Sequence, residues 1–248
     1  MSIIAPNRVV YLNPLEESGP VQEPLMRFRL TYEGELKASG RDPENGQHNR
    51  MAPHKQAIRK IFHGQLRQFW QTNKFLREQT LHQDEIHIAP GQVPHFMGTL
   101  FMGVGSGKTL PLVEYVGSNF QRNGYRFVPL VCEEFSLLCN LNILFLRRDY
   151  PLGVISAGDL DNRVKTIIDA LRMPQGAHEL RGNESPAAGE DPFFCLLEDD
   201  DLVTGLTVES DMLLDPPPSG DAGLSQVKLV ISVELKPDSV TMFNLGFA

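Results

Sequence analysis

The stretch "GDLDNRVKTIIDALRMP", residues 158–174, decides how this chain is interpreted. Its apolar residues recur every three or four positions, as on one face of an amphipathic helix; they are Val164, Ile167, Ile168 and Leu171. Asp159 or Asp161 is suited to the N-cap, because a carboxylate accepts hydrogen bonds from the free N–H groups at a helix start. The stretch therefore predicts a capped helix with one buried face.

A second face of the predicted helix is charged. Asp161, Lys165 and Asp169 stand at positions i, i+4 and i+8, so a carboxylate lies one turn on either side of a lysine. Taken alone, this pattern is typical of a solvated surface helix whose ion pairs contribute about 0.2–0.5 kcal/mol each. Any catalytic role must be argued from the rest of the chain.

A second cluster of acids occurs in "LLEDDDLVTGLTV", residues 196–208. Four consecutive acids, 198–201, stand between two apolar pairs that should anchor them against a core. Acid clusters usually belong to solvated loops, but adjacent carboxylates repel one another unless a cation neutralises them. Mg²⁺ prefers oxygen ligands of this kind. If this turn folds beside the helix start, Asp159, Asp161 and Asp200 could together hold such an ion.

The remaining sequence predicts both strands and helices. Strands are expected over 26–39, 125–132 and 135–148, the last of them central, and a helix is expected from Pro53 to Phe75. Residues 1–25 are interpreted as an N-terminal arm. Residues 76–124 are rich in glycine and weakly periodic, and they are interpreted as an insertion.

The run "GVGSGKTLPL", residues 103–112, imitates a nucleotide-binding phosphate loop. That motif requires a glycine, four free residues and then Gly-Lys-Ser/Thr, followed by a helix. Met102 occupies the place of the first glycine, and Pro111 and Gly117 argue against a following helix. We therefore expect an ordinary glycine-rich loop and no nucleotide hydrolysis.

Composition sets broad limits on the function. The chain has 248 residues, 41% of them hydrophobic and 22% charged, as in soluble globular proteins. No apolar run approaches the roughly 20 residues of a membrane span, and the start lacks the layout of a secretory signal. Three cysteines without paired metal-ligand spacing favour reduced thiols. We expect a cytoplasmic protein without a membrane partner.

The acidic and helical motifs together resemble the RusA family of crossover junction (Holliday junction) endodeoxyribonucleases. The matching residues are Asp159-Leu160-Asp161-Asn162, Lys165, Asp169-Ala170-Leu171 and the later pair Asp199-Asp200, for which a slip to Asp200-Asp201 is an open alternative. The resemblance covers residues 135–171 and 196–236 well and 26–75 loosely. The link 172–195 is longer than the family's short turn, and its composition suggests a flexible loop.

The resemblance implies a small α+β fold in which a mixed sheet packs against helices. Residues 26–248 would form a single RusA-like nuclease domain with insertions at about 76–124 and 172–195, acting on branched DNA as a homodimer with Mg²⁺ or Mn²⁺. It further implies roles for the acids and the lysine. Asp159, Asp161, Asp199 and Asp200 would ligate the metal, Lys165 would contact the scissile phosphate, and Asp169 would support Lys165 or the ligands.

The charge distribution bears on DNA binding. The net charge is −8, but residues 48–82 hold seven basic residues against one acid, whereas residues 172–201 hold eight acids against two arginines. A basic helix is commonly a solvated face, yet beside a phosphodiesterase motif it predicts contacts with the DNA backbone. The expected contacts are Arg50, Lys55, Arg59, Lys60, Arg67, Arg147 and Arg148. The alternative function is a catalytically inactive RusA-like DNA- or protein-binding module.

Overall fold

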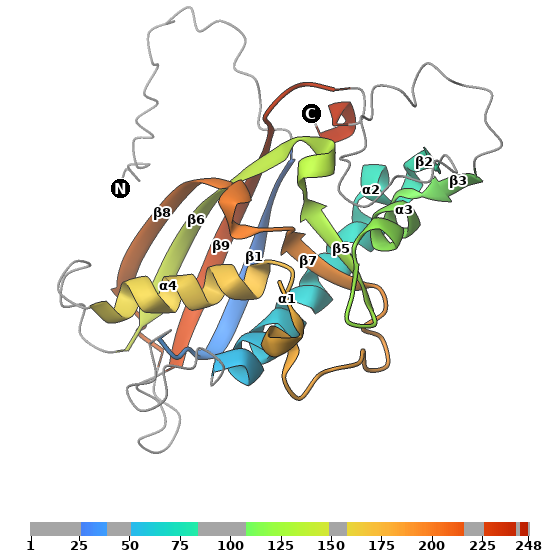
Figure 1. The fold of residues 1–248 in the computed structure, drawn as a ribbon. Coiled ribbons are helices and arrows are strands. Elements are labelled where there is room, and N and C mark those ends of the chain that lie inside the picture. Colours follow the sequence, from blue (N-terminus) through green and yellow to red (C-terminus); the bar gives the residue numbers. More distant parts are fainter. Residues whose placement is uncertain are drawn as a thin grey trace, which may run out of the picture.

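A four-stranded mixed sheet forms the centre of the molecule (Figure 1). The computed structural model describes residues 26–38, 51–83, 108–148, 158–215, 226–241 and 244–247. The strand order is β1-β9-β6-β8, where β6 pairs in parallel with β8 and the other pairs are antiparallel. The strands are β1 (Met26–Glu35), β6 (Leu137–Arg147), β8 (Val203–Met212) and β9 (Gln226–Pro237). The predicted α+β class and the interior position of the strand within 135–148 are confirmed.

Strict alternation of side chains explains how β6 and β9 cover the core. In both strands every second residue is buried, as expected when one face of a sheet packs against helices. The register places Leu141 opposite Val233, Ile143 opposite Ile231 and Phe145 opposite Leu229, so a one-residue slip would expose the whole apolar set.

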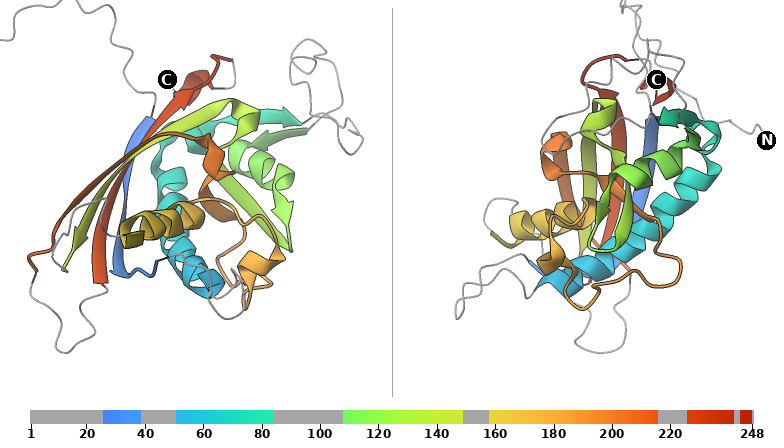
Figure 2. Two further views of the ribbon diagram at one scale, coloured as in Figure 1. Left: turned by 60° about the vertical axis from the view of Figure 1, so that its left-hand side comes forward. Right: turned by 45° about the vertical axis from the view of Figure 1, so that its right-hand side comes forward.

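Two helices cover this inner face of the sheet, as Figure 2 shows. They are α1 (Ala52–Thr72) and α4 (Gly158–Leu171), which pack against each other. The helix expected from 53 to 75 is confirmed, although α1 ends at Thr72 and, after Asn73, a second helix α2 (Lys74–Glu78) begins. The buried side of α1 includes Ile58, Phe62, Leu66 and Trp70, whereas Ile61 is 44% exposed.

A second, smaller sheet packs against α1. Its order is β4-β5-β7, with β5 and β7 parallel; the strands are β4 (Gln121–Arg122), β5 (Tyr125–Val131) and β7 (Phe193–Leu197). The link 172–195 therefore follows a defined path over α1, with Met173 and Leu180 buried. Where we expected only a flexible loop, its apolar residues join the core.

The described part of the expected insertion 76–124 is built into the fold. Besides α2 and β4 it contains β2 (Thr80–Gln83), β3 (Lys108–Pro111) and α3 (Leu112–Asn119). A helix does follow the Gly-Lys-Thr run, contrary to our expectation. The rejection of a phosphate loop still holds, because Lys108 and Thr109 pair with β2 in an antiparallel ladder and so do not lie at the helix N-terminus, where a phosphate loop places them.

Short turns of 3-10 helix complete the structure. They are η3 (Glu133–Phe135), η4 (Ala177–Leu180), η5 (Asp200–Leu202) and η7 (Leu245–Phe247). Among the helices in the described ranges, none is long and apolar enough to cross a bilayer. The three cysteines are buried free thiols, as the sequence predicts.

His63 joins α1 to β7 as a neutral imidazole. Its Nδ1 accepts a hydrogen bond from the Phe194 N–H at 2.9 Å, so Nε2 carries the proton and donates to the Gly189 carbonyl at 3.1 Å. Burial lowers the pKa of His63, and nearby Arg67 and Lys60 act in the same direction, against Glu190 and the Gly189 hydrogen bond.

Stability should consequently fall in mild acid. Because the pKa of His63 is lower in the folded chain, the unfolded chain binds the proton more tightly, and the stabilisation present above about pH 6.5 is lost as the pH falls. Urea unfolding at pH 7.5 and pH 5 should show a smaller loss in His63→Asn, whose amide oxygen can accept from Phe194 without titrating. An equal loss in both proteins would contradict this role.

Candidate functional site

The charged face of α4 divides into an exposed part and a buried part. Asp161 and Lys165 are exposed, whereas Asp169 is 6% exposed. Asp159 lies in the first turn of α4, but its side chain is outside the described residues. Of the i, i+4 and i+8 residues on this face, Asp161 and Lys165, one helical turn apart, are thus available to a molecule that approaches the helix.

Asp169 is fixed by partners other than Lys165. Its Oδ2 accepts from Lys55 Nζ at 2.5 Å, and its Oδ1 lies 3.6 Å from Arg172 Nε. Lys55 projects from the first turn of α1, so this pair joins the two helices. The expected support of Lys165 by Asp169 is replaced by a structural role, and Lys55 is engaged inside the protein.

Arg59 is the centre of a buried network between α1 and the end of α4. Its side chain is 1% exposed. It donates through Nε to the Arg172 carbonyl at 3.1 Å and through Nη2 to the Asp169 carbonyl at 2.8 Å. A carboxylate oxygen of Glu179 lies 3.6 Å away. Arg59 thereby satisfies carbonyls at the C-terminal end of α4, where intrahelical donors run out.

The other expected DNA contacts that the structure describes also have partners within the protein. Lys60 pairs with Glu190 at 2.8 Å, and Arg148 donates to the Asp215 carbonyl. Arg67 is exposed and makes only a long, 3.4 Å hydrogen bond to Gly189. Because Arg59 and Arg147 are buried, the DNA contacts expected of them are not available. Arg50 lies outside the described residues.

The four consecutive acids Glu198–Asp201, called the acidic turn below, lead into η5 and form its start. Asp199 accepts from the Asp200 N–H through Oδ1 at 2.7 Å and from Gln175 Nε2 through Oδ2 at 2.5 Å. A side-chain hydrogen bond between the carboxyl groups of Asp200 and Asp199, followed by burial, raises the pKa of Asp200. The folded chain therefore disfavours the charged form of Asp200, which is the condition that an added cation would relieve.

The acidic turn packs against the C-terminal end of α4. The Met173 N–H donates to the Leu197 carbonyl at 2.8 Å, and Arg172 Nε lies 3.8 Å from Asp200 Oδ1. Asp161 precedes Asp169 by eight residues and is therefore about 12 Å further along the helix axis, at 1.5 Å per residue. The turn does not fold beside the helix start, as the three-carboxylate arrangement required.

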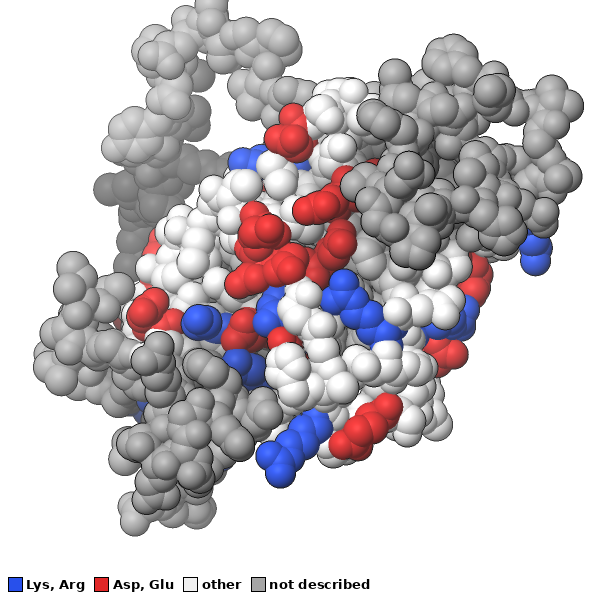
Figure 3. All heavy atoms as spheres, in the orientation of Figure 1, with Lys and Arg blue, Asp and Glu red and all other residues white. Residues whose placement is uncertain are grey.

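Further acids surround the turn in a patch that Figure 3 shows above α4. Burial raises the pKa of Glu198, which accepts from the Glu133 N–H at 3.1 Å, and the neighbouring carboxylates of Glu133 and Glu134 raise it further. The sequence analysis missed these two glutamates and Arg172, because they follow β5 or end α4 and meet the turn only in the folded chain. The one sequence signal for these residues is that each stands just before a buried apolar residue, Phe135 or Met173.

The donor set suits a divalent cation in part. Within the described ranges, no three or more His, Cys, Asp or Glu side chains are grouped as metal ligands would be. Mg²⁺ is nevertheless often held by one or two carboxylates with waters and substrate phosphates, and Asp199 and Asp200 supply such a pair. Asp159 stands in the first turn of α4, at the opposite end from these two carboxylates, so the expected ligand set of Asp159, Asp161 and Asp200 is not brought together.

Comparisons with protein-family models, with curated proteins and with solved structures found no match for this chain. Any assignment of function therefore has to be argued from the arrangement of its own residues.

Proposed function

We propose that this chain is a RusA-like, metal-dependent endonuclease that cleaves branched DNA such as a four-way junction. One observation carries the proposal: α4 presents Asp161 and Lys165 to solvent, and the acidic turn packs against the C-terminal end of the same helix. The offset of about 12 Å along α4 is close to that of three or four 3.4 Å base-pair steps, so a DNA arm lying along the helix would meet both groups.

The charges near the site suggest separate roles for its residues. Lys165 would bind a backbone phosphate, and Asp161, one turn away, would accept a hydrogen bond from a water or hold a cation. Arg172 would keep Asp200 in place through the contact between them. Bound at Asp199 and Asp200, Mg²⁺ or Mn²⁺ would supply an activated water and neutralise charge on the leaving oxygen.

The acidic patch predicts that DNA binding itself depends on divalent ions. Glu133, Glu134 and Glu198 to Asp201 would repel a phosphate backbone in the absence of counter-ions. The test is a cleavage assay on a synthetic junction and on a linear duplex of the same arm sequence, each with Mg²⁺ or with chelator. We expect metal-dependent nicks in the junction only. Equal cleavage of the duplex, or cleavage in chelator, would contradict the proposal.

The second candidate is an inactive RusA-like module that binds DNA or protein. It is favoured by the separation of Asp161 from the acidic turn, which lies at the other end of α4. This function predicts junction binding, or binding of a protein, that is unchanged in Asp161→Asn and never accompanied by cleavage. A homodimer would give either function two equivalent sites on a two-fold symmetric junction.

A further inference from the structure

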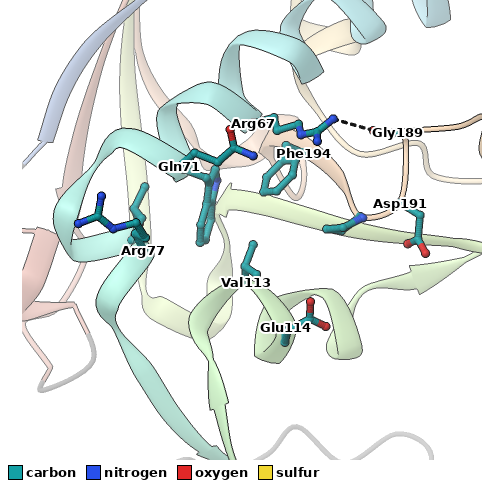
Figure 4. Close-up of a pocket in the computed structure, with 11 residues that line it drawn as sticks. Arg67, Gln71, Arg77, Val113, Glu114, Gly189, Asp191 and Phe194 are labelled. Atoms are coloured by element: carbon teal, nitrogen blue, oxygen red, sulfur yellow. Dashed lines mark hydrogen bonds between the residues drawn. The ribbon is translucent and has the colours of Figure 1, made fainter.

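A pocket of about 290 Å³ lies at the end of α1 that is remote from Asp169 (Figure 4). Its walls come from α1, α2, α3 and the segment that leads into β7. Trp70, Leu76, Val113, Pro192 and Phe194 give it an apolar interior. The rings of Trp70 and Phe194 are tilted against each other with centroids 5.9 Å apart. The pocket is of a size for one ring system, at the small end of ligand sites.

Polar groups on the rim of this pocket differ in how far they are already engaged. Glu114 and Asp191 both form ion pairs with Arg126, at 2.8 Å and 2.9 Å, so their negative charges are already paired within the protein. Arg67 is exposed, and its hydrogen bond to Gly189 is long. No described residue hydrogen-bonds to the exposed amide of Gln71. Arg77 also lines the pocket, and it pairs with Glu78 at 2.7 Å. An incoming ligand would thus find one loosely held guanidinium, that of Arg67, and one uncommitted amide beside an apolar, partly aromatic interior.

We infer that this pocket binds an unpaired nucleobase together with its 5′ phosphate. A planar ring packs well on apolar and aromatic walls, and sequence-tolerant binding of single strands uses aromatic surfaces beside cations in this way. The Gln71 amide offers a donor and an acceptor to the edge of a base, and Arg67 offers a fork of donors to a phosphate. An aliphatic or phenyl side chain of a peptide would use neither group.

The pocket is separate from the proposed catalytic residues. Arg67 follows Lys55, the partner of Asp169, by twelve residues on the same helix, which corresponds to about 18 Å. Binding there requires neither a metal ion nor Asp161. It would nonetheless suit an enzyme of branched DNA, because a branch point exposes bases that have lost their stacking partners.

The chain carries its own probe for this site, because Trp70 is its one tryptophan. Fluorescence of the full chain in EDTA would be titrated with each deoxynucleoside 5′-monophosphate and with a ten-residue single-stranded oligonucleotide. We expect saturable quenching by the mononucleotides, by the oligonucleotide or by both. Comparing the mononucleotide and oligonucleotide titrations shows whether the pocket takes a free nucleotide or an unstacked base within a strand. Deoxyribose 5-phosphate and an abasic oligonucleotide should not quench.

Three variants make the test decisive. Val113→Phe fills the interior and should abolish quenching, and Arg67→Ala should weaken binding about tenfold through the loss of a charge-assisted hydrogen bond. Arg27→Ala, an exposed arginine of β1, should leave binding unchanged. Circular dichroism verifies that each variant is folded. Quenching that persists in Val113→Phe, or that only N-acetylphenylalaninamide produces, would overturn the inference, as would no quenching at all.

The Asp161→Asn protein is titrated beside the wild type. Unchanged nucleotide binding by that variant would show that the pocket binds its ligand without the proposed catalytic residue Asp161. The inference can thus fail while junction cleavage persists, and junction cleavage can fail while nucleotide binding persists.

Discussion

Replacing Arg59 by alanine is expected to lower the free energy of unfolding by about 4 kcal/mol, as for a broken buried charge network. The variant leaves the carbonyls of Asp169 and Arg172 without their donor and leaves Glu179 with one cation fewer. It also opens a cavity where a fully buried side chain stood. Urea denaturation, followed by Trp70 fluorescence, measures the loss.

Arg67→Ala is the matched control for this experiment, since it removes an exposed arginine two turns further along α1. Its free energy of unfolding should change by less than about 0.5 kcal/mol. If Arg59→Ala cost as little as the control and mainly weakened DNA binding, Arg59 would instead be a surface contact, and the network described between α1 and α4 would be wrong.

Replacing Asp200 by asparagine should separate stability from activity. If the acidic turn holds the catalytic ion, cleavage should fall by about a thousandfold, because metal assistance contributes several kcal/mol to the barrier. The fold should lose nothing. The pKa of Asp200 is raised by Asp199, so its charge is tolerated less well folded than unfolded, and the neutral amide removes that penalty.

The direction of the pKa shift of Asp200 also predicts how the substitution changes thermal stability. Because the folded pKa is raised, the contribution of Asp200 to stability is present below its unfolded pKa and declines as the pH rises through the folded value. At neutral pH, Asp200→Asn should therefore melt at the same temperature as the wild type or above it. Asp201→Asn, its exposed neighbour, is the control. A marked drop in melting temperature for Asp200→Asn alone would mean that Asp200 is structural.

The sequence was sufficient to predict the elements that follow from periodicity. Alternation identified β1, runs of strand-forming apolar residues identified β5 and β6, and helical spacing identified α1 and α4. The sequence also led to the expectation that β6 lies inside the sheet. It did not identify α3, where Pro111 and Gly117 argued against a helix although a proline is acceptable at the helix start.

The candidate site was harder to predict because its charges meet across long separations in the chain. The sequence pattern favoured Lys165 as the partner of Asp169 at i,i+4, but Lys55, 114 residues away, is its close partner. Similarly, the basic residues of α1 suggested a DNA-binding surface. In the folded chain, Arg59 is instead buried and donates to the carbonyls of Arg172 and Asp169. Local spacing reports which face a residue occupies, but not which distant element covers that face.

The most direct measurement of the central claim is the cleavage rate of a four-way DNA junction in Mg²⁺ by the wild type and by Asp161→Asn. Asp161 is exposed, so the substitution should leave the fold intact. We predict paired nicks in opposed strands for the wild type, and junction binding without nicks for the variant. Equal cleavage by both proteins, or junction binding without cleavage by either, would contradict the assignment of α4 as the catalytic helix.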